Sequence, residues 1–277
     1  MAHTLNMSEL PLVEVETAAV WNVGGAGGAS RFKLWLVQIT ILIAAIVAWE
    51  VCSRIWDLEF WVSRPSEVWG ELKEWHRDGD LVEGIQATMS AGLIGFVFGA
   101  AAGSILGLTL GWLRGLGTVL EPFVFALYTL PKIALAPLFV LWFGIGTLPK
   151  IVLAGVLVFF LVFFTTFQGA KNADRSFLEM ATLMGASRLG TFGKVIVPAS
   201  SVWIFTGLRI ALPYSIIGAV VGEFIAATNG IGFMIKNATS MLNTAGVFAG
   251  LVVLMMLAWI LTKVLTVIER KLLHWSQ

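Results

Sequence analysis

Six stretches of the chain are long enough and apolar enough to cross a lipid bilayer as helices. A helix needs roughly 20 mostly apolar residues to span the hydrocarbon core. The stretches that qualify cover residues 34–51, 86–112, 119–143, 150–168, 202–227 and 246–267. An even number of crossings returns the chain to the side on which it started. The pattern therefore predicts an all-α integral membrane protein with six transmembrane helices and both termini on the same side.

The third stretch is interrupted by two prolines, Pro131 and Pro137, with Lys132 beside the first. Each proline removes one backbone hydrogen bond from a helix and displaces a carbonyl group. Such breaks are tolerated at membrane depth only where the backbone meets protein or water instead of lipid. We therefore expect this span to be broken and to line an interior pathway, which makes Pro131, Lys132 and Pro137 candidate pathway residues.

Glycines recur in the second stretch at intervals of three and four residues, which places them on one side of a helix. They are Gly92, Gly95, Gly99, Gly103, Gly107 and Gly111. Small residues let helix backbones approach closely in a membrane, where lipid supplies no hydrophobic drive for association. The stripe therefore predicts a helix-packing seam, not a chemical site.

The composition agrees with a membrane protein. Hydrophobic residues make up 58% of the 277-residue chain, charged residues only 13%, and the mean hydropathy is +0.87, outside the range of soluble domains. The net charge of +1 argues against a nucleic-acid partner. Cys52 is the single cysteine, which excludes an intrachain disulfide and a cysteine metal cluster, and the three histidines lie too far apart in sequence to suggest a metal site.

The distribution of Lys and Arg predicts the orientation. Bases gather on the N-terminal side of the membrane, whereas the first loop on the other side, residues 52–85, carries eight acids against four bases. Because positive residues stay on the cytoplasmic side, both termini are predicted to be cytoplasmic and the first loop external. The predicted organisation is a disordered cytoplasmic tail at residues 1–33, a first helix and external elbow loop at 34–85, the main transmembrane domain at 86–270 with a cytoplasmic loop at 170–200, and a short cytoplasmic tail at 271–277.

The loop at residues 170–200 contains a predicted short amphipathic helix. Ser176 followed three residues later by Glu179 is a capping-box start, and Phe177 and Met180 give one face an apolar surface. Gly185 can end the helix, because glycine tolerates the positive φ common at a helix C-terminus. An exposed helix of this kind either lies in a groove of another protein or rests on lipid headgroups.

The spacing of this loop resembles the cytoplasmic signature loop of binding-protein-dependent ABC transporter permeases. Glu179 and Ala181 are followed by Gly185, and Pro198 closes the pattern after an aliphatic-x-aliphatic run. The runs at residues 130–137 and 141–146 are similar to the nitrate, sulfonate and taurine subgroup of these permeases. The resemblance covers about residues 60 to 270.

The resemblance implies a type I ABC importer-like bundle with a cytoplasmic coupling helix, in the bacterial cytoplasmic (inner) membrane. The residues that it implies for coupling are Ser176, Glu179, Ala181, Gly185, Ala186 and Pro198. It also implies a pair of ATP-binding subunits, a second copy of this chain in a homodimer and an external solute-binding protein. The sequence has no Gly-x-x-x-x-Gly-Lys-Ser/Thr phosphate loop. ATP and magnesium are therefore expected on the partner subunit, and this chain is expected to bind no cofactor and to be a transport subunit, not an enzyme.

For such a permease the resemblance implies a small anionic substrate, such as nitrate, an alkanesulfonate or taurine, moved by alternating access. Permeases of this type also carry vitamin precursors. The alternative from another class is a secondary transporter driven by an ion gradient. Such transporters usually show internal repeats and paired titratable residues at the midplane, and no convincing repeat is found in this sequence.

Two charged residues fall inside predicted spans, Glu223 in the fifth and Lys132 in the third. A charge at the bilayer centre costs about 2.5 to 3.5 kcal/mol on insertion scales, so each should face protein or water. In a functional role, Lys132 would present positive charge to an anionic substrate and Glu223 would belong to an outer gate. In a structural role, the two would pair with each other or with backbone groups and hold helices together, or Glu223 would reach the outer interface.

Overall fold

The computed structural model describes residues 28–56 and 59–272, and most of them are helical. The helices are α1 (Gly28–Ile55), α2 (Glu59–Val62), α3 (Pro65–Asp78), α4 (Asp80–Trp112), α5 (Arg114–Thr129), α6 (Ala136–Phe143), α7 (Thr147–Lys171), α8 (Arg175–Leu183), α9 (Arg188–Thr191), α10 (Val197–Ala226), α11 (Ile231–Ser240) and α12 (Thr244–Leu272), with a 3₁₀ turn at Lys132–Leu135 and a π-helical turn at Phe192–Ile196. The predicted tails lie largely outside the described residues.

The prediction of an all-α membrane protein is confirmed. Five described helices have the length and apolar character of a span: Phe32–Ile55, Asp80–Trp112, Thr147–Lys171, Arg188–Ala226 and Thr244–Lys271. The predicted third span is a bent pair, Gly115–Thr129 and Lys132–Phe143, whose axes meet at 74°. The described chain thus holds five candidate spans, or six if this bent pair is one span. The predicted interruption of the third span is present.

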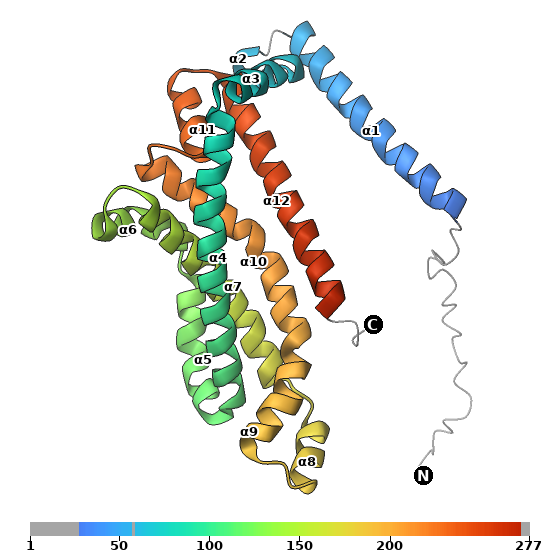
Figure 1. Ribbon diagram of the computed structural model, residues 1–277, viewed down its shortest axis with the longest axis vertical. Coiled ribbons are helices and arrows are strands. Elements are labelled where there is room, and N and C mark those ends of the chain that lie inside the picture. The colour runs from blue at the N-terminus through green and yellow to red at the C-terminus, as the bar shows by residue number, and fades with distance from the viewer. Residues whose placement is uncertain (1–27, 57–58, 273–277) are drawn as a thin grey trace, which may run out of the picture. The chain divides into compact units, whose positions relative to one another are not determined.

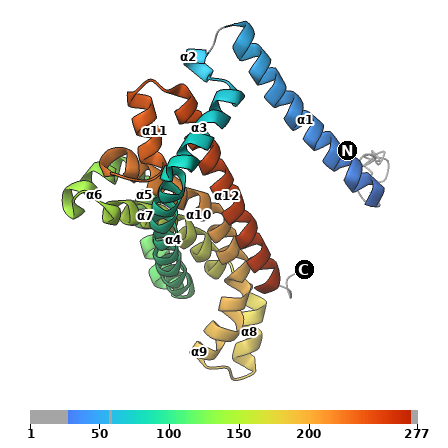
Figure 2. The same ribbon diagram turned by 45° about the horizontal axis from the view of Figure 1, so that its top comes forward.

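The chain divides after Trp49 into two compact units. The first contains the apolar beginning of α1, and the second contains the helices from α2 onward. Within the second unit, Figures 1 and 2 show α4, α7, α10 and α12 as long helices of one bundle. Helices α8 and α9 lie at one end of this bundle, and α3 and α11 lie at the other. For brevity, these are called the loop end and the α11 end.

The glycine stripe of α4 is a packing seam, as predicted. All six glycines are buried. A Cβ atom at Gly103 would lie 2.8 Å from the carbonyl oxygen of Phe159 in α7, and one at Gly107 would lie 2.8 Å from the carbonyl oxygen of Phe163. Only Gly92, nearest the α11 end of the stripe, faces α10 instead, where its Cβ would lie 3.2 Å from Ile216. Backbone-to-backbone contact thus joins α4 and α7 along most of their length.

A second group of glycines brings α10 against the other side of α7. A Cβ atom at Gly218 would lie 2.7 Å from the Cα of Ala154, and one at Gly222 would lie 3.0 Å from the Cα of Lys150. Helix α7 is therefore the centre of a three-helix core. Near its middle, Val158 and Val162 are fully buried together with side chains from α4 and α10.

The α11 end is closed by short helices. Ile231 and Ile235 of α11 form an apolar cluster with Val253 of α12, and Leu72 of α3 packs against it. Helix α3 begins at Pro65, within the loop at residues 52–85 that the sequence predicts to be external. Towards the C-terminal end of α12, Glu269 forms an ion pair with Arg209 of α10. Helix α12 thus contacts α11 at one end and α10 towards the other.

Replacing Gly103 by alanine is expected to destabilise the bundle. The added methyl group would meet backbone atoms of Phe159 and Phe163 at 2.8 and 2.9 Å, so α4 and α7 must separate. Overpacking of this kind costs about 1 to 3 kcal/mol. The melting temperature of purified Gly103→Ala protein should fall by several degrees. Gly70→Ala is the matched control, because no heavy atom lies within 4 Å of a Cβ at that helical position. An equal effect of the two substitutions would contradict the seam.

Candidate functional site

The helix in the loop at residues 170–200 is present, but its start differs from the prediction. Helix α8 begins at Arg175, and Asp174 is the capping residue, whose carboxylate accepts a hydrogen bond of 2.8 Å from the amide of Ser176. The predicted capping box of Ser176 and Glu179 is therefore wrong. Aspartate caps a helix as well as serine, and Asp174 reaches the free amide first. Ser176 becomes the second residue of the helix, and Glu179 lies exposed near its middle.

Gly185 ends the helix in the way that its residue type predicts. Its φ angle is +74°, in the left-handed region. The amide of Gly185 donates to the carbonyl of Thr182, and the amide of Ala186 donates to the carbonyl of Ala181, both at 3.0 Å. These two bonds are a Schellman motif, which satisfies carbonyls that a helix end leaves free. Ala181, Gly185 and Ala186, selected by their spacing, are therefore the residues that form this turn.

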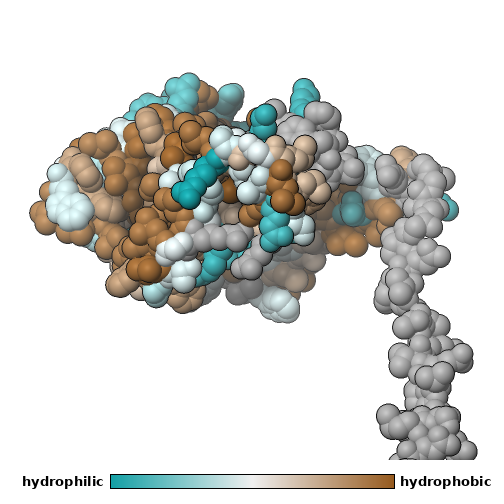
Figure 3. Space-filling view, turned by 90° about the horizontal axis from the view of Figure 1, so that it is seen from below, coloured by the Kyte–Doolittle hydropathy of each residue, from teal (hydrophilic) through white to brown (hydrophobic). Residues whose placement is uncertain are grey.

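Helix α8 presents apolar side chains to its surroundings. Phe177 and Met180 are more than half exposed, and Leu183 and Met184 are 88% and 81% exposed. Figure 3 views the molecule from this end and shows hydrophobic atoms beside hydrophilic ones, not a uniformly polar surface. These four side chains, three on α8 and Met184 directly after it, are called the α8 patch below. Water solvates such a patch poorly, so it is suited to burial against a partner.

The loop is joined to α10 by unbroken helical structure. Ser187 caps α9 by accepting a hydrogen bond of 3.1 Å from the amide of Gly190. The π-helical turn that follows ends where the amide of Val197 donates to the carbonyl of Phe192. Pro198 follows directly, in the first turn of α10. A proline has no amide hydrogen, so it donates no hydrogen bond to the turn that precedes it. The ring of Phe192 lies 4.8 Å from that of Trp112, which ties this turn to the end of α4.

An ion pair lies beside the loop. Lys171, the last residue of α7, is 2.5 Å from the carboxylate of Glu121 in α5. Both side chains are one-third exposed, so the pair contributes little to stability. The pair joins α5, the first half of the broken span, to α7, the helix that precedes α8.

In the broken span, the two prolines act differently. Pro131 precedes the 3₁₀ turn at the break, whereas Pro137 lies in the first turn of α6, a position that proline favours. Pro137 therefore starts a helix and does not break one, contrary to the prediction that both prolines interrupt the span. The ammonium of Lys132 donates to the carbonyl of Tyr128 and lies 4.8 Å from the ring centres of Tyr128 and Phe160. Lys132 thus satisfies a carbonyl at the end of α5.

The partner of Glu223 is Lys150, not Lys132. The carboxylate of Glu223 lies 3.6 Å from the ammonium of Lys150, and the two side chains are 0% and 2% exposed. It also accepts hydrogen bonds from the hydroxyl of Thr88 at 3.0 Å and from the amide of Gly232 at 2.8 Å. The interpretation that Glu223 reaches the outer interface is therefore wrong. Lys150 lies at a predicted span end, where lysine ordinarily extends to water, so the sequence pattern gives no sign of this pairing.

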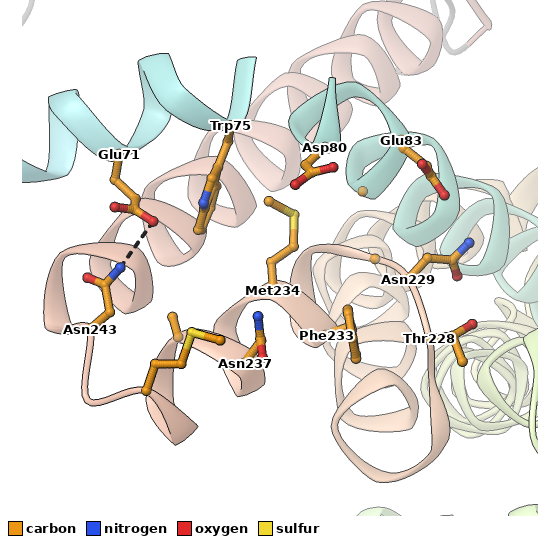
Figure 4. A pocket seen from close by; sticks show the side chains of 14 residues that line it. Glu71, Trp75, Asp80, Glu83, Thr228, Asn229, Phe233, Met234, Asn237 and Asn243 are labelled. Carbon is orange, nitrogen blue, oxygen red and sulfur yellow. Dashed lines mark hydrogen bonds between the residues drawn. The ribbon is translucent and has the colours of Figure 1, made fainter. Parts of the chain in front are cut away.

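A polar pocket lies next to this network at the α11 end. Its volume is about 240 Å³, and its lining includes Gly84 of α4 and Gly230, which precedes α11. Both of these helices also donate hydrogen bonds to Glu223. Figure 4 shows the carboxylates of Asp80 and Glu83 from α4 on one side, and Glu71 hydrogen-bonded to Asn243 at 3.1 Å on another. The α11 end is thus acidic at its surface, in contrast to the apolar α8 patch at the loop end. In the described residues, no group of three or more His, Cys, Asp or Glu side chains is arranged to hold a metal ion.

The structure separates the predicted site residues into three places. The six loop residues lie together at the loop end, Glu223 lies at the α11 end, and Lys132 lies at the break between α5 and α6. The loop end and the α11 end are thus separate places, with the long helices of the bundle between them.

Comparisons with known proteins agree on one family. Residues 92–274 match the family described as binding-protein-dependent transport system inner membrane component. An aliphatic sulfonates transport permease protein of Bacillus subtilis is 30% identical over 249 residues, which is 90% of each chain. A formylaminopyrimidine transport permease protein of Halalkalibacterium halodurans is 31% identical over 84% of this chain and 92% of its own. A taurine transport system permease protein of Escherichia coli is 29% identical over 85% of this chain and 88% of its own.

The fold is also similar to that of a solved structure. A chain of the MetNI methionine ABC transporter, in an inward-facing conformation, superposes with a TM-score of 0.61 at 20% sequence identity. The match covers 69% of this chain and 95% of that one. At this identity the likeness concerns the arrangement of helices alone.

Replacing Gly185 by alanine is expected to open the end of α8. An alanine at a left-handed φ is strained by about 1 to 2 kcal/mol, so the two hydrogen bonds of the turn should form less often. Hydrogen exchange of the peptide that covers α8 should become about tenfold faster. Gly193→Ala is the control, because Gly193 has an ordinary φ and open space around its Cα. Equal protection of α8 in the two variants would contradict the role of Gly185.

Proposed function

The chain belongs to the family of binding-protein-dependent transport system inner membrane components, and we propose that it is the permease subunit of an ATP-driven importer. As a member of this family it is a multi-pass inner membrane protein. The observation that carries the proposal is the α8 patch: a short helix, closed by a Schellman turn, that exposes large apolar side chains at one end of a membrane bundle. The chain itself has no phosphate loop, so the energy comes from another subunit.

In this proposal α8 is the coupling helix. It lies on the cytoplasmic side and docks its apolar patch in a groove of an ATP-binding subunit, a common mode of helix recognition. ATP and magnesium bind to that subunit. Glu179 is exposed on the same helix and can contact the groove, while Gly185 ends α8 and Pro198 lies at the start of α10, after the π-helical turn. When the two ATP-binding subunits close, α8 moves and the bundle exchanges inward for outward access.

The proposed assembly contains two copies of this chain, two ATP-binding subunits and an external solute-binding protein. The two copies form a homodimer with the solute pathway between them. The acidic α11 end faces the outside and receives the binding protein. Support for this orientation comes from the bases near residues 170–200 and the acids of the first loop.

The proposed substrate is a small anion of the alkanesulfonate, taurine or nitrate type. Relatives named for aliphatic sulfonates and for taurine support this choice, and Lys132, beside the break of the third span, is the proposed positive charge of the pathway. The relative named for formylaminopyrimidine supports the alternative of a vitamin precursor. Thermal unfolding of the cognate binding protein with taurine, ethanesulfonate, nitrate or a thiamine precursor decides between them, because only the true ligand raises its melting temperature.

Uptake into liposomes tests the transport mechanism. Liposomes with this chain and its ATP-binding subunits should accumulate the ligand of the binding protein only when ATP is enclosed and the binding protein is present outside. A secondary transporter would instead accumulate solute along an ion gradient without ATP. Uptake that follows the gradient and ignores ATP would overturn the proposed function.

Replacing Met184 by glutamate is expected to detach the ATP-binding subunit. Met184, which directly follows α8, is 81% exposed, and a charge there would be buried without a partner on docking. Affinity for the ATP-binding subunit should fall by about tenfold or more, as measured by pull-down from detergent. Met241→Glu is the control, since Met241 is 71% exposed at the opposite end of the bundle. If both variants retain the subunit equally, α8 is not the docking element.

A further inference from the structure

Four helices meet at the carboxylate of Glu223. Thr88 comes from α4, Lys150 from α7, Glu223 from α10 and Gly232 from α11. Among the described residues, the buried charged side chains are those of Lys150 and Glu223. Buried charges are retained only where partners compensate them. This group is called the Glu223 network.

The Glu223 network accepts hydrogen bonds from the free amides at the beginning of α11. The first amides of a helix have no partner inside it. In α11 the amide of Ile231 donates to the hydroxyl oxygen of Thr88 at 2.9 Å, and the amide of Gly232 donates to Glu223 at 2.8 Å. The hydroxyl of Thr88 in turn donates to Glu223. A negative charge at a helix N-terminus is also favoured by the helix dipole. Glu223 and Thr88 therefore act as the N-terminal cap of a helix that neither of them belongs to.

The fit at this contact is close. A Cβ atom at Gly230 would lie 2.6 Å from a carboxylate oxygen of Glu223, and one at Gly232 would lie 2.9 Å from the Cβ of Glu223. The φ of Gly230 is +116°, which favours glycine. Lys150 also donates to the carbonyl of Asn229 at 3.3 Å. The turn before α11 is thus held on two sides, and a small displacement of α10 would break these contacts.

Helix α10 is continuous with the loop that carries α8. From Arg188 to Ala226 the chain runs as one helical segment through the π-helical turn. Glu223 lies in the last turn of this segment. Glu223 is thus joined to α9 by continuous helical structure, and the turn at residues 184–187 lies between α9 and α8. Thr88 and Lys150 lie on the separate helices α4 and α7.

We propose that the Glu223 network is a latch that holds α11 in a closed position against the bundle, and that Thr88 and Lys150 are its positioning residues. The inference rests on the proposed function. Motion of α8 shifts α10, draws Glu223 away from the amides of α11 and frees α11 to open. The latch closes again when α10 returns.

The test measures access to α11 in the assembled complex in liposomes. Cys52, the single native cysteine, is replaced by serine, and a reporter is introduced by Ile235→Cys. Ile235 is buried on α11 in the apolar cluster with Val253, so a membrane-impermeant maleimide should label it only when α11 opens. In the otherwise unchanged complex, labelling should be slow without nucleotide and faster when the ATP-binding subunits are trapped closed with ATP and vanadate.

Thr88→Val removes the hydroxyl and keeps the shape of the side chain, whereas Thr88→Ser keeps the hydroxyl. Loss of a hydrogen bond to a charged group corresponds to about a tenfold change in an opening equilibrium. Thr88→Val should therefore raise labelling without nucleotide by about tenfold, and Thr88→Ser should restore slow labelling. Glu223→Gln, which weakens the link to Lys150 and retains a hydrogen-bonding oxygen, should also raise it.

Three results would overturn the latch. The first is labelling of the parent complex that is the same with and without vanadate trapping. The second is equal labelling of Thr88→Val and Thr88→Ser, and the third is a loss of folded Thr88→Val protein while the remaining folded protein is labelled at the parent rate.

The proposed function has a separate readout in the same liposomes. If uptake depends on ATP while labelling does not change, the latch is wrong and the proposed function stands. If uptake does not depend on ATP, the proposed function itself fails.

Discussion

The close contact between α4 and α7 is the constraint on which the rest of this bundle depends. Lipid gives two apolar helices no reason to associate, so packing and local polar contacts must hold them. Glycines along α4 let backbone meet backbone, and a second group on α10 does the same on the other side of α7. Because α7 lies between these two seams, Lys150 is brought against Glu223 with almost no exposure to solvent. Without the seams, neither charge could be buried.

The two ends of the bundle differ in chemistry, and α10 connects them. The loop end presents large apolar side chains from α8, whereas the α11 end presents carboxylates and amides around a pocket. Apolar exposure suits a lasting contact with another protein, and charged groups suit recognition of a partner that comes and goes. One helical segment, residues 188–226, runs from the loop end to the buried carboxylate of Glu223 at the other. This arrangement fits a membrane subunit that receives energy on one side and admits solute on the other.

The sequence predicted those features that depend on local rules. The spans follow from apolar length, the seam from glycines at helical spacing, the break from Pro131, and the end of α8 from Gly185. The wrong predictions are of two kinds. One is the choice between two neighbouring capping residues, and the other is the pairing of side chains that are distant in sequence. Asp174 and Ser176 are both good caps, and only the path of the chain after α7 decides between them. The pairing of Lys150 with Glu223 depends on the contact of α7 with α10, and no local pattern contains it. The proposed roles in coupling and in the solute pathway depend on contacts with other subunits, so the fold of a single chain does not reveal them.

The central claim is that this chain works only as part of an assembly with an ATP-binding subunit. Native mass spectrometry of the complex, extracted gently from the membrane that produces it, measures this directly. We expect a particle with two copies of this 30.0 kDa chain and two copies of a nucleotide-binding subunit. A particle that contains this chain without any nucleotide-binding subunit, and that still moves solute after reconstitution, would contradict it.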